Sequence, residues 1–200
     1  MLFNDICNYM EIGETLYVST RRQWRSWLAT NHASAKEIWL VYFKKHAGKP
    51  SIPYNDAVEE ALCFGWIDSI LKFLDHDRTV QRYTPRQKNS NLSEMNKERV
   101  RRMMELGKMT AVGFQSIQKY LHYTADGKPM IIPFEIPLDI LSELQCDPVV
   151  WHNFENFPEY YKHIRLGFID SSRNRPDFFR KRLDYFIRMT RQNKKFGMIQ

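Results

Sequence analysis

The sequence predicts an α+β fold: a small, mainly antiparallel sheet with packed helices, followed by a helical C-terminal unit. Three observations predict this class. Runs rich in β-branched and aromatic residues are confined to the first half of the chain, and helical patterns with capping signals separate them and fill the rest. The 200 residues are 43% hydrophobic and 26% charged, which is enough apolar surface for a core.

The first elements alternate between strand and helix. Strands are predicted over Thr15–Ser19 and Glu37–Lys45. Between them, Thr20 and Gln23 form a capping-box pattern that predicts the start of a helix. A second helix is predicted over Tyr54–Phe64, where small and aliphatic residues recur at helical spacing.

A hairpin and a capped helix follow. Two strand-like runs, Trp66–Leu74 and Arg78–Thr84, are joined by three polar residues, which favours an antiparallel hairpin. A polar loop over 85–92 then leads to Ser93, a good N-cap for a helix over Glu94–Leu106.

The rest of the chain is predicted to be helical apart from one linker. Thr110–His122 has a helical pattern, and three prolines and Gly127 mark the segment up to Pro137 as a linker. Further helices are predicted over Leu138–Leu144, from Pro148, and over Pro158–Ile169 and Pro176–Met189. The predicted organisation is an α+β unit over 1–125, a linker over 126–137 and a helical unit over 138–200 packed on the first.

Composition excludes several classes. No run approaches the roughly 20 apolar residues of a membrane span, and residues 1–10 do not resemble a signal peptide, so we expect a cytoplasmic protein. Three scattered cysteines, including Cys7, and six singly placed histidines form no array with metal-ligand spacing. We therefore expect no disulfide framework, no metal and no cofactor.

The net charge of +7 is concentrated in two blocks. Residues 78–108 contain nine Lys and Arg against three Asp and Glu, and residues 173–195 contain nine against two. Such blocks can attract nucleic acid or an anionic surface, although a basic helix face is often simply solvated.

The densest group of polar residues lies between the predicted hairpin and the helix after it. We expect Asp68 and Arg82 to face each other across the hairpin, with Trp66 and Tyr83 as aromatic walls. Such a pocket suits an anionic or amide-bearing ligand. An alternative is that the Asp68–Arg82 pair only fixes the hairpin register. The candidate ligand-binding residues are Trp66, Asp68, Arg82, Tyr83, Thr84, Arg86, Asn91, Asn96 and Arg99.

Catalytic residues are harder to find. Cys63 lies between Leu62 and Phe64 on an apolar helix, which predicts a buried, unreactive thiol. We predict no catalytic residue, and a non-enzymatic role is favoured.

Three motifs in order resemble the YdeI/OmpD-associated, or bacteriocin-protection, family. They are EEALCFGWID (Glu59–Asp68), RYTPR (Arg82–Arg86) and SNLSEMNKERVRRMMELGKMT (Ser90–Thr110). The resemblance extends upstream over Trp24–Ile52 and more faintly over Phe154–Leu183. It implies tolerance of bacteriocins, antimicrobial peptides or envelope stress, and it implies no particular reaction, cofactor or metal.

Three functions follow as hypotheses. The first is a non-catalytic binding protein for a small or anionic ligand or a protein partner, in a bacteriocin-tolerance context. The second is a nucleic-acid or anionic-surface binder that uses the basic blocks. The third is a small-molecule enzyme with its site at Asp68, Arg82 and Arg86.

Overall fold

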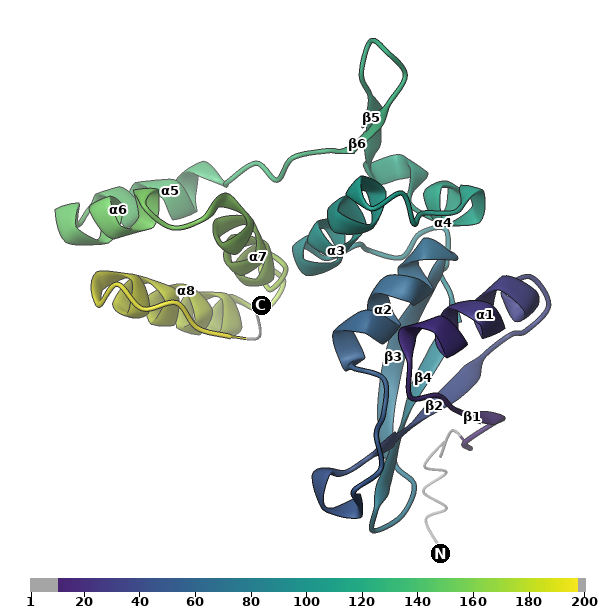
Figure 1. The fold of residues 1–200 in the computed structure, drawn as a ribbon. Coiled ribbons are helices and arrows are strands. Elements are labelled where there is room, and N and C mark those ends of the chain that lie inside the picture. The colour runs from purple at the N-terminus through teal and green to yellow at the C-terminus, as the bar shows by residue number, and fades with distance from the viewer. Residues whose placement is uncertain (1–10, 198–200) are drawn as a thin grey trace, which may run out of the picture. The chain divides into compact units, whose positions relative to one another are not determined.

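The structure, a computed structural model, describes residues 11–197 and divides into two compact units. The first unit comprises the residues up to Ser90 together with Met103–Gln118, and the second comprises Asn91–Arg102 and the residues from Lys119 onward. A four-stranded, mainly antiparallel sheet and a helical C-terminal part confirm the predicted α+β class (Figure 1). Cys7 lies outside the described residues. The predicted packing of the C-terminal helices on the α+β unit stays a prediction.

The first unit is built on a sheet of strand order β1-β2-β4-β3, in which only β1 and β2 are parallel. Its strands are β1 (Thr15–Tyr17), β2 (Ile38–Phe43), β3 (Trp66–Phe73) and β4 (Arg78–Pro85). Its helical elements are α1 (Arg21–Asn31), the 3-10 helix η1 (Lys45–Ala47), α2 (Tyr54–Cys63) and α4 (Ala111–Ser116). The predicted capping box of Thr20 and Gln23 is present at the start of α1.

Both faces of the sheet are covered near its centre. Helices α1 and α2 lie on one face (Figure 1), where Trp24 packs edge-on against Tyr83 and its indole Nε1 donates to the carbonyl of Ala57 at 2.9 Å. On the opposite face, Trp39 and Val80 form a small apolar cluster. This two-sided burial explains the continuous apolar sequence of β2.

The end of α2 is set by two glycines. Gly65 adopts φ +73°, a left-handed conformation that ends the helix within one residue of its predicted end. Gly113 in α4 packs so closely on the backbone of Cys63 that a Cβ atom would collide with its carbonyl. Thr110 donates its hydroxyl to the same carbonyl at 2.6 Å and caps α4.

The prediction of one helix over Thr110–His122 is wrong in its second half. Helix α4 ends at Ser116, and η2 (Gln118–Tyr120) leads into a hairpin formed by β5 (Leu121–Tyr123) and β6 (Pro129–Ile131). The predicted linker over 126–137 therefore includes a strand. The turn is stabilised locally, because the backbone N–H of Thr124 donates to the carbonyl of Lys128 and Gly127 supplies a left-handed φ of +78°.

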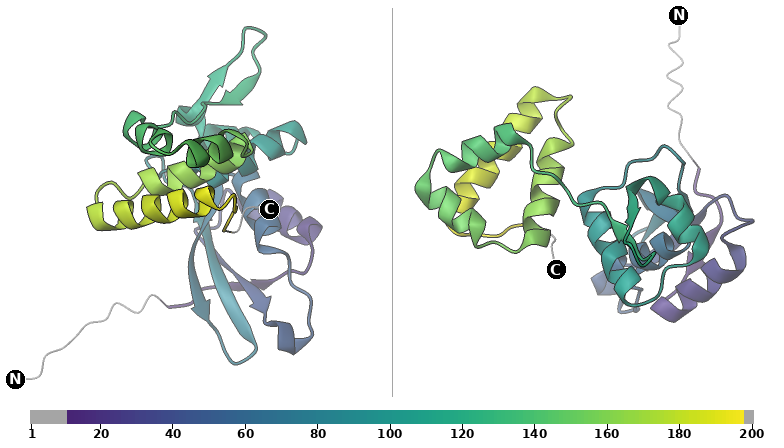
Figure 2. Two further views of the ribbon diagram at one scale, coloured as in Figure 1. Left: turned by 90° about the vertical axis from the view of Figure 1, so that its left-hand side faces the viewer. Right: turned by 90° about the horizontal axis from the view of Figure 1, so that it is seen from above.

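The second unit takes in most of α3 (Glu94–Glu105), the β5–β6 hairpin and four C-terminal helices. These helices are α5 (Leu138–Gln145), α6 (Pro148–Glu155), α7 (Glu159–Asp170) and α8 (Pro176–Arg191). In the view from above they surround a common interior (Figure 2). That interior is aromatic and aliphatic, with Leu183 and Phe186 of α8 fully buried. Phe168 of α7, by contrast, is 49% exposed.

Candidate functional site

A charged network joins α1 to α2. The side chains of Glu59 and Glu60 are buried, at 0% and 1% exposure, although both are acidic. The guanidinium of Arg21 forms ion pairs with Asp56, Glu59 and Glu60, and Arg25 donates to Glu60 at 2.6 Å. Buried carboxylates require such partners, because an unpaired buried charge is strongly unfavourable.

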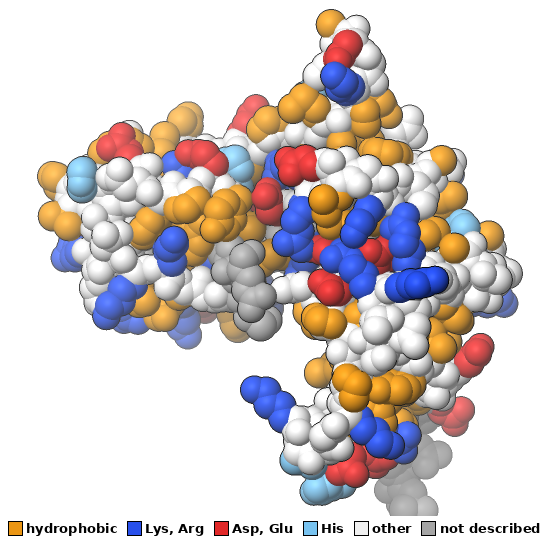
Figure 3. Space-filling model, in the orientation of Figure 1, with side chains coloured by type: hydrophobic (Ala, Val, Ile, Leu, Met, Phe, Trp, Pro, Cys, Tyr) orange, Lys and Arg blue, Asp and Glu red, His pale blue; other side chains and the backbone are white. Residues whose placement is uncertain are grey.

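The same cations line a cleft of about 540 Å³. Figure 3 shows Lys and Arg side chains gathered around the upper end of α2, with Asp and Glu side chains among them. Arg25 also donates to the carbonyl of Lys108 at 2.9 Å, which fixes its guanidinium at the cleft wall. The acids of α2 gave no signal of their own, because carboxylates are common in the first turns of a helix, where they complement its dipole. The arginines at Arg21 and Arg25, four residues apart on the preceding helix, were the available signal.

The expected pair of Asp68 and Arg82 does not form. Asp68 lies opposite Tyr83 in the register, so Arg82, one residue earlier, points to the other face of the sheet. There Arg82 donates to Glu37 from Nε at 2.8 Å, and Trp39 donates to the same carboxylate at 2.9 Å. These two hydrogen bonds, from Trp39 and then Arg82, lower the pKa of Glu37.

Asp68 belongs instead to a cluster of tyrosines. The hydroxyl of Tyr54 donates to Asp68 at 2.7 Å, and the hydroxyls of Tyr42 and Tyr83 lie 3.3 Å apart. Burial raises the pKa of Tyr42 to about 12, and it raises the pKa of Tyr83 as well. Near neutral pH both hydroxyls therefore stay protonated, which suits them to hydrogen bonding and not to proton abstraction.

The other predicted site residues are divided between the two units. In the first unit, Trp66 is buried and its indole N–H donates to the carbonyl of His32 at 3.1 Å. Thr84 lies opposite Ile67 in the β3–β4 pairing, and the backbone N–H of Arg86 donates to the carbonyl of Gly65. In the second unit, Asn91 accepts from the hydroxyl of Tyr120 at 3.1 Å, and Asn96 accepts from Arg99 at 2.7 Å. Neither unit by itself assembles the nine residues, and their role in binding stays a prediction.

Cys63 is fully buried, as predicted. Burial raises the pKa of its thiol to about 11, so the thiolate needed for nucleophilic chemistry is scarce near neutral pH.

Helices α7 and α8 form a groove with aromatic walls and a cationic rim. Its volume is about 300 Å³. Phe168, Phe178 and Tyr185 remain 49%, 53% and 40% exposed beside it. Arg182 stacks over the ring of Phe168 at 3.7 Å and donates to that residue's carbonyl at 2.8 Å. Aromatic surface and positive charge are thus combined on one face.

Four of the five cations of α8 divide into two sets. At about 100° per residue, Lys181 and Arg182 fall on the groove side with the exposed aromatic rings, and both line the groove. Arg180 and Arg191 fall on another side, where Arg180 pairs with Glu143 of α5 at 2.7 Å and Arg191 pairs with Asp147. The first set lies beside apolar surface that is still exposed.

A third constituent of the groove is Arg165 of α7. Its guanidinium stacks over Phe196 at 4.7 Å, and its buried Nε has no hydrogen-bond partner among the described residues. Burial lowers the pKa of Arg165, although an arginine stays charged at any physiological pH. The groove therefore contains a partly desolvated positive charge, which favours an anionic ligand.

Comparison with protein families divides the chain into two parts close to Gln118, where the first structural unit ends. Residues 16–116 match the model described as Domain of unknown function (DUF8412). The chain belongs to this family. In this DUF8412 protein, residues 133–193 match a second model, described as Bacteriocin-protection, YdeI or OmpD-Associated. Searches of curated proteins and of solved structures returned no match.

The second match confirms the resemblance to the bacteriocin-protection family for the C-terminal part of the DUF8412 protein. The three motifs that indicated this resemblance lie instead in the N-terminal part, within the residues that match DUF8412. The aromatic and cationic groove falls mainly in the segment that matches the bacteriocin-protection model. Among the described residues, none of the helices combines the length and hydrophobicity that crossing a bilayer requires.

Proposed function

We propose that this protein is a non-catalytic, cytoplasmic binding protein of the bacteriocin-protection type, and that its C-terminal unit binds the anionic surface of a lipid membrane from one side. The observation that carries the proposal is the groove of α7 and α8. Its rim presents Lys181 and Arg182 beside the exposed rings of Phe178 and Tyr185.

Charge and apolar surface on the same helix face are what interfacial binding requires. Cations near an anionic membrane contribute about 1 kcal/mol each, and aromatic side chains insert at the level of the headgroups. The inward face of α8 is occupied separately by Leu183 and Phe186, so membrane contact does not require the helix to leave its core.

The test is binding to vesicles that contain phosphatidylglycerol, compared with vesicles of phosphatidylcholine alone. The variant Lys181→Gln/Arg182→Gln is expected to lose about 30-fold in affinity for the anionic vesicles, because two cations of about 1 kcal/mol each are removed. Affinity of the natural chain should also fall as salt is raised, since the attraction is screened.

The matched control is Arg180→Gln/Arg191→Gln. It makes the same change in net charge on the same helix, but these arginines pair with Glu143 and Asp147 on another side. Its affinity for the anionic vesicles should change much less than that of the groove variant. Equal losses in both variants would show that net charge alone drives binding and would contradict a groove-specific contact. Tighter binding to an oligonucleotide than to vesicles, lost in the groove variant, would favour the nucleic-acid alternative.

A further inference from the structure

Two loops that are about 30 residues apart in sequence are held together at one end of the sheet. The 3-10 helix η1 carries His46, and the turn between β3 and β4 carries His76 and Asp77. The backbone N–H of Lys44 donates to the carbonyl of Asp77 at 2.8 Å, and its ammonium donates to the carbonyl of His76 at 2.7 Å. The two loops therefore keep a fixed separation.

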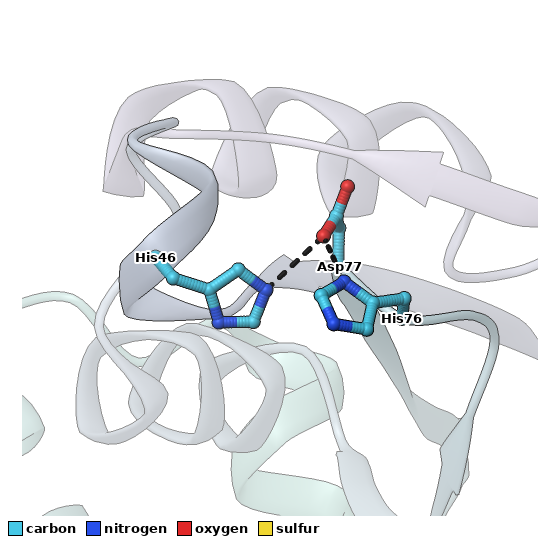
Figure 4. Close-up of side chains that lie close together, drawn as sticks. All are labelled: His46, His76 and Asp77. Atoms are coloured by element: carbon cyan, nitrogen blue, oxygen red, sulfur yellow. Dashed lines mark hydrogen bonds and ion pairs between the residues drawn. The ribbon is translucent and has the colours of Figure 1, made fainter.

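The side chains of these loops converge on one carboxylate oxygen (Figure 4). The Nε2 atom of His46 lies 3.1 Å from Oδ1 of Asp77, and the Nδ1 atom of His76 lies 2.7 Å from the same oxygen. All three candidate ligand atoms lie within 4.8 Å of one another. Two imidazoles and one carboxylate are a ligand set that first-row divalent metals bind.

The turn holds Asp77 in place without using its side chain. Oδ1 of Asp75 accepts hydrogen bonds from the backbone N–H groups of Asp77 and Arg78, at 2.9 and 2.8 Å. Arg78 also pairs with the carboxylate of Asp75, so this cation is compensated by a group other than the three candidate ligands.

We infer that His46, His76 and Asp77 bind a zinc ion through Nε2, Nδ1 and Oδ1. Ligand atoms about 2.0–2.1 Å from a tetrahedral zinc lie about 3.3 Å from one another. The present separations of 2.7 and 3.1 Å to the shared oxygen are close to that value, so small ring movements complete the geometry. All three side chains are exposed, and a fourth position stays open to water or to a ligand from a partner.

The experiment is calorimetric titration of the full chain with Zn²⁺ alone, in a Cys7→Ser/Cys146→Ser background that removes binding by these two thiols. We expect one zinc per chain. His46→Ala and His76→Ala should each weaken binding at least tenfold, about the loss seen when a metal ligand's support is removed. The matched control is His122→Ala, an exposed histidine on β5, which should leave the affinity unchanged.

A second measurement observes the ligands directly. In NMR spectra, the imidazole signals of His46 and His76 should shift together at one equivalent of Zn²⁺, while the signal of His122 should not. Circular dichroism checks that each variant is folded. An absence of binding heat in the folded chain, or an unchanged affinity in both His46→Ala and His76→Ala, would overturn the inference.

Discussion

Two regions of this protein use ion pairs differently: the junction of α1 and α2, and the surface of the C-terminal helices. In the first unit, Glu59 and Glu60 are buried and paired with arginines of α1. In the second unit the main core is aromatic and aliphatic, and ion pairs such as Arg173 with Asp139 lie at the surface. Buried pairs cannot lose one partner without a large cost, whereas exposed pairs contribute little. Surface cations of the second unit can therefore take part in binding at little cost in stability.

The largest expected effect comes from the buried network. Glu60→Gln keeps the shape of a buried side chain but leaves Arg21 and Arg25, which are 26% and 35% exposed, with less compensating charge. The free energy of unfolding should fall by about 3–5 kcal/mol. Urea denaturation followed by tryptophan fluorescence reports this, since four of the five tryptophans lie in the first unit. The exposed Glu14→Gln is the control and should change stability by less than about 0.5 kcal/mol. Similar stabilities for the two variants would contradict the structural role of the network.

The second effect tests the apolar core of the other unit. Leu183→Ala removes a fully buried side chain and should lower the free energy of unfolding by about 2–5 kcal/mol. Phe178→Ala on the same helix removes a larger but half-exposed side chain and should be much milder. Urea denaturation followed by circular dichroism measures the loss in both variants, because the C-terminal part is helical. A loss in Phe178→Ala as large as in Leu183→Ala would mean that the groove residues also support the fold.

Local signals in the sequence predicted most of the fold. The capping box of Thr20 and Gln23 is present as predicted, and α2 ends within one residue of its predicted end, because caps and helix ends depend on a few neighbouring residues. The β5–β6 hairpin was missed because its strands have three residues each and carry little periodic pattern.

The site was less predictable because it depends on register and on distant contacts. The pairing of β3 with β4 shifts between Asp68 and Leu71, an irregularity that no local sequence pattern indicates. Arg82 therefore faces away from Asp68. His46 and His76 are brought together only by tertiary structure, so their spacing in sequence held no metal signature. The basic block 173–195 was visible, but its division into paired cations and groove cations required the contacts of α5 and α6.

A third prediction compares one cysteine from each unit. Cys63 ends α2 and is buried, whereas Cys146 follows α5 and is exposed. Since burial raises the pKa of Cys63 to about 11, a maleimide or disulfide reagent at neutral pH should label it at least about a hundredfold more slowly than Cys146. The rate at Cys63 should rise with pH as that pKa is approached, as long as the chain stays folded. Mass spectrometry of digests measures the labelling of each cysteine separately. Comparable labelling rates for Cys63 and Cys146 at neutral pH would show that Cys63 can act as a nucleophile.

The smallest effect completes the comparison between buried and exposed ion pairs. Arg173 donates to Asp139 from two nitrogens, each at 2.9 Å, and also pairs with Asp170, a geometry at least as favourable as that of Glu60. These groups are largely exposed, so water competes for both charges and salt screens their attraction. Arg173→Gln should therefore lower the free energy of unfolding by less than about 1 kcal/mol, and added salt should reduce the difference further.

Because Arg173 lowers the pKa of Asp139, the small contribution of this ion pair should be present at neutral pH. It should be lost on acidification through the range in which that carboxyl takes up its proton. Urea denaturation at neutral and at acidic pH measures both points. A loss as large as that of Glu60→Gln would show that number and geometry of hydrogen bonds, and not burial, decide what an ion pair contributes in this protein.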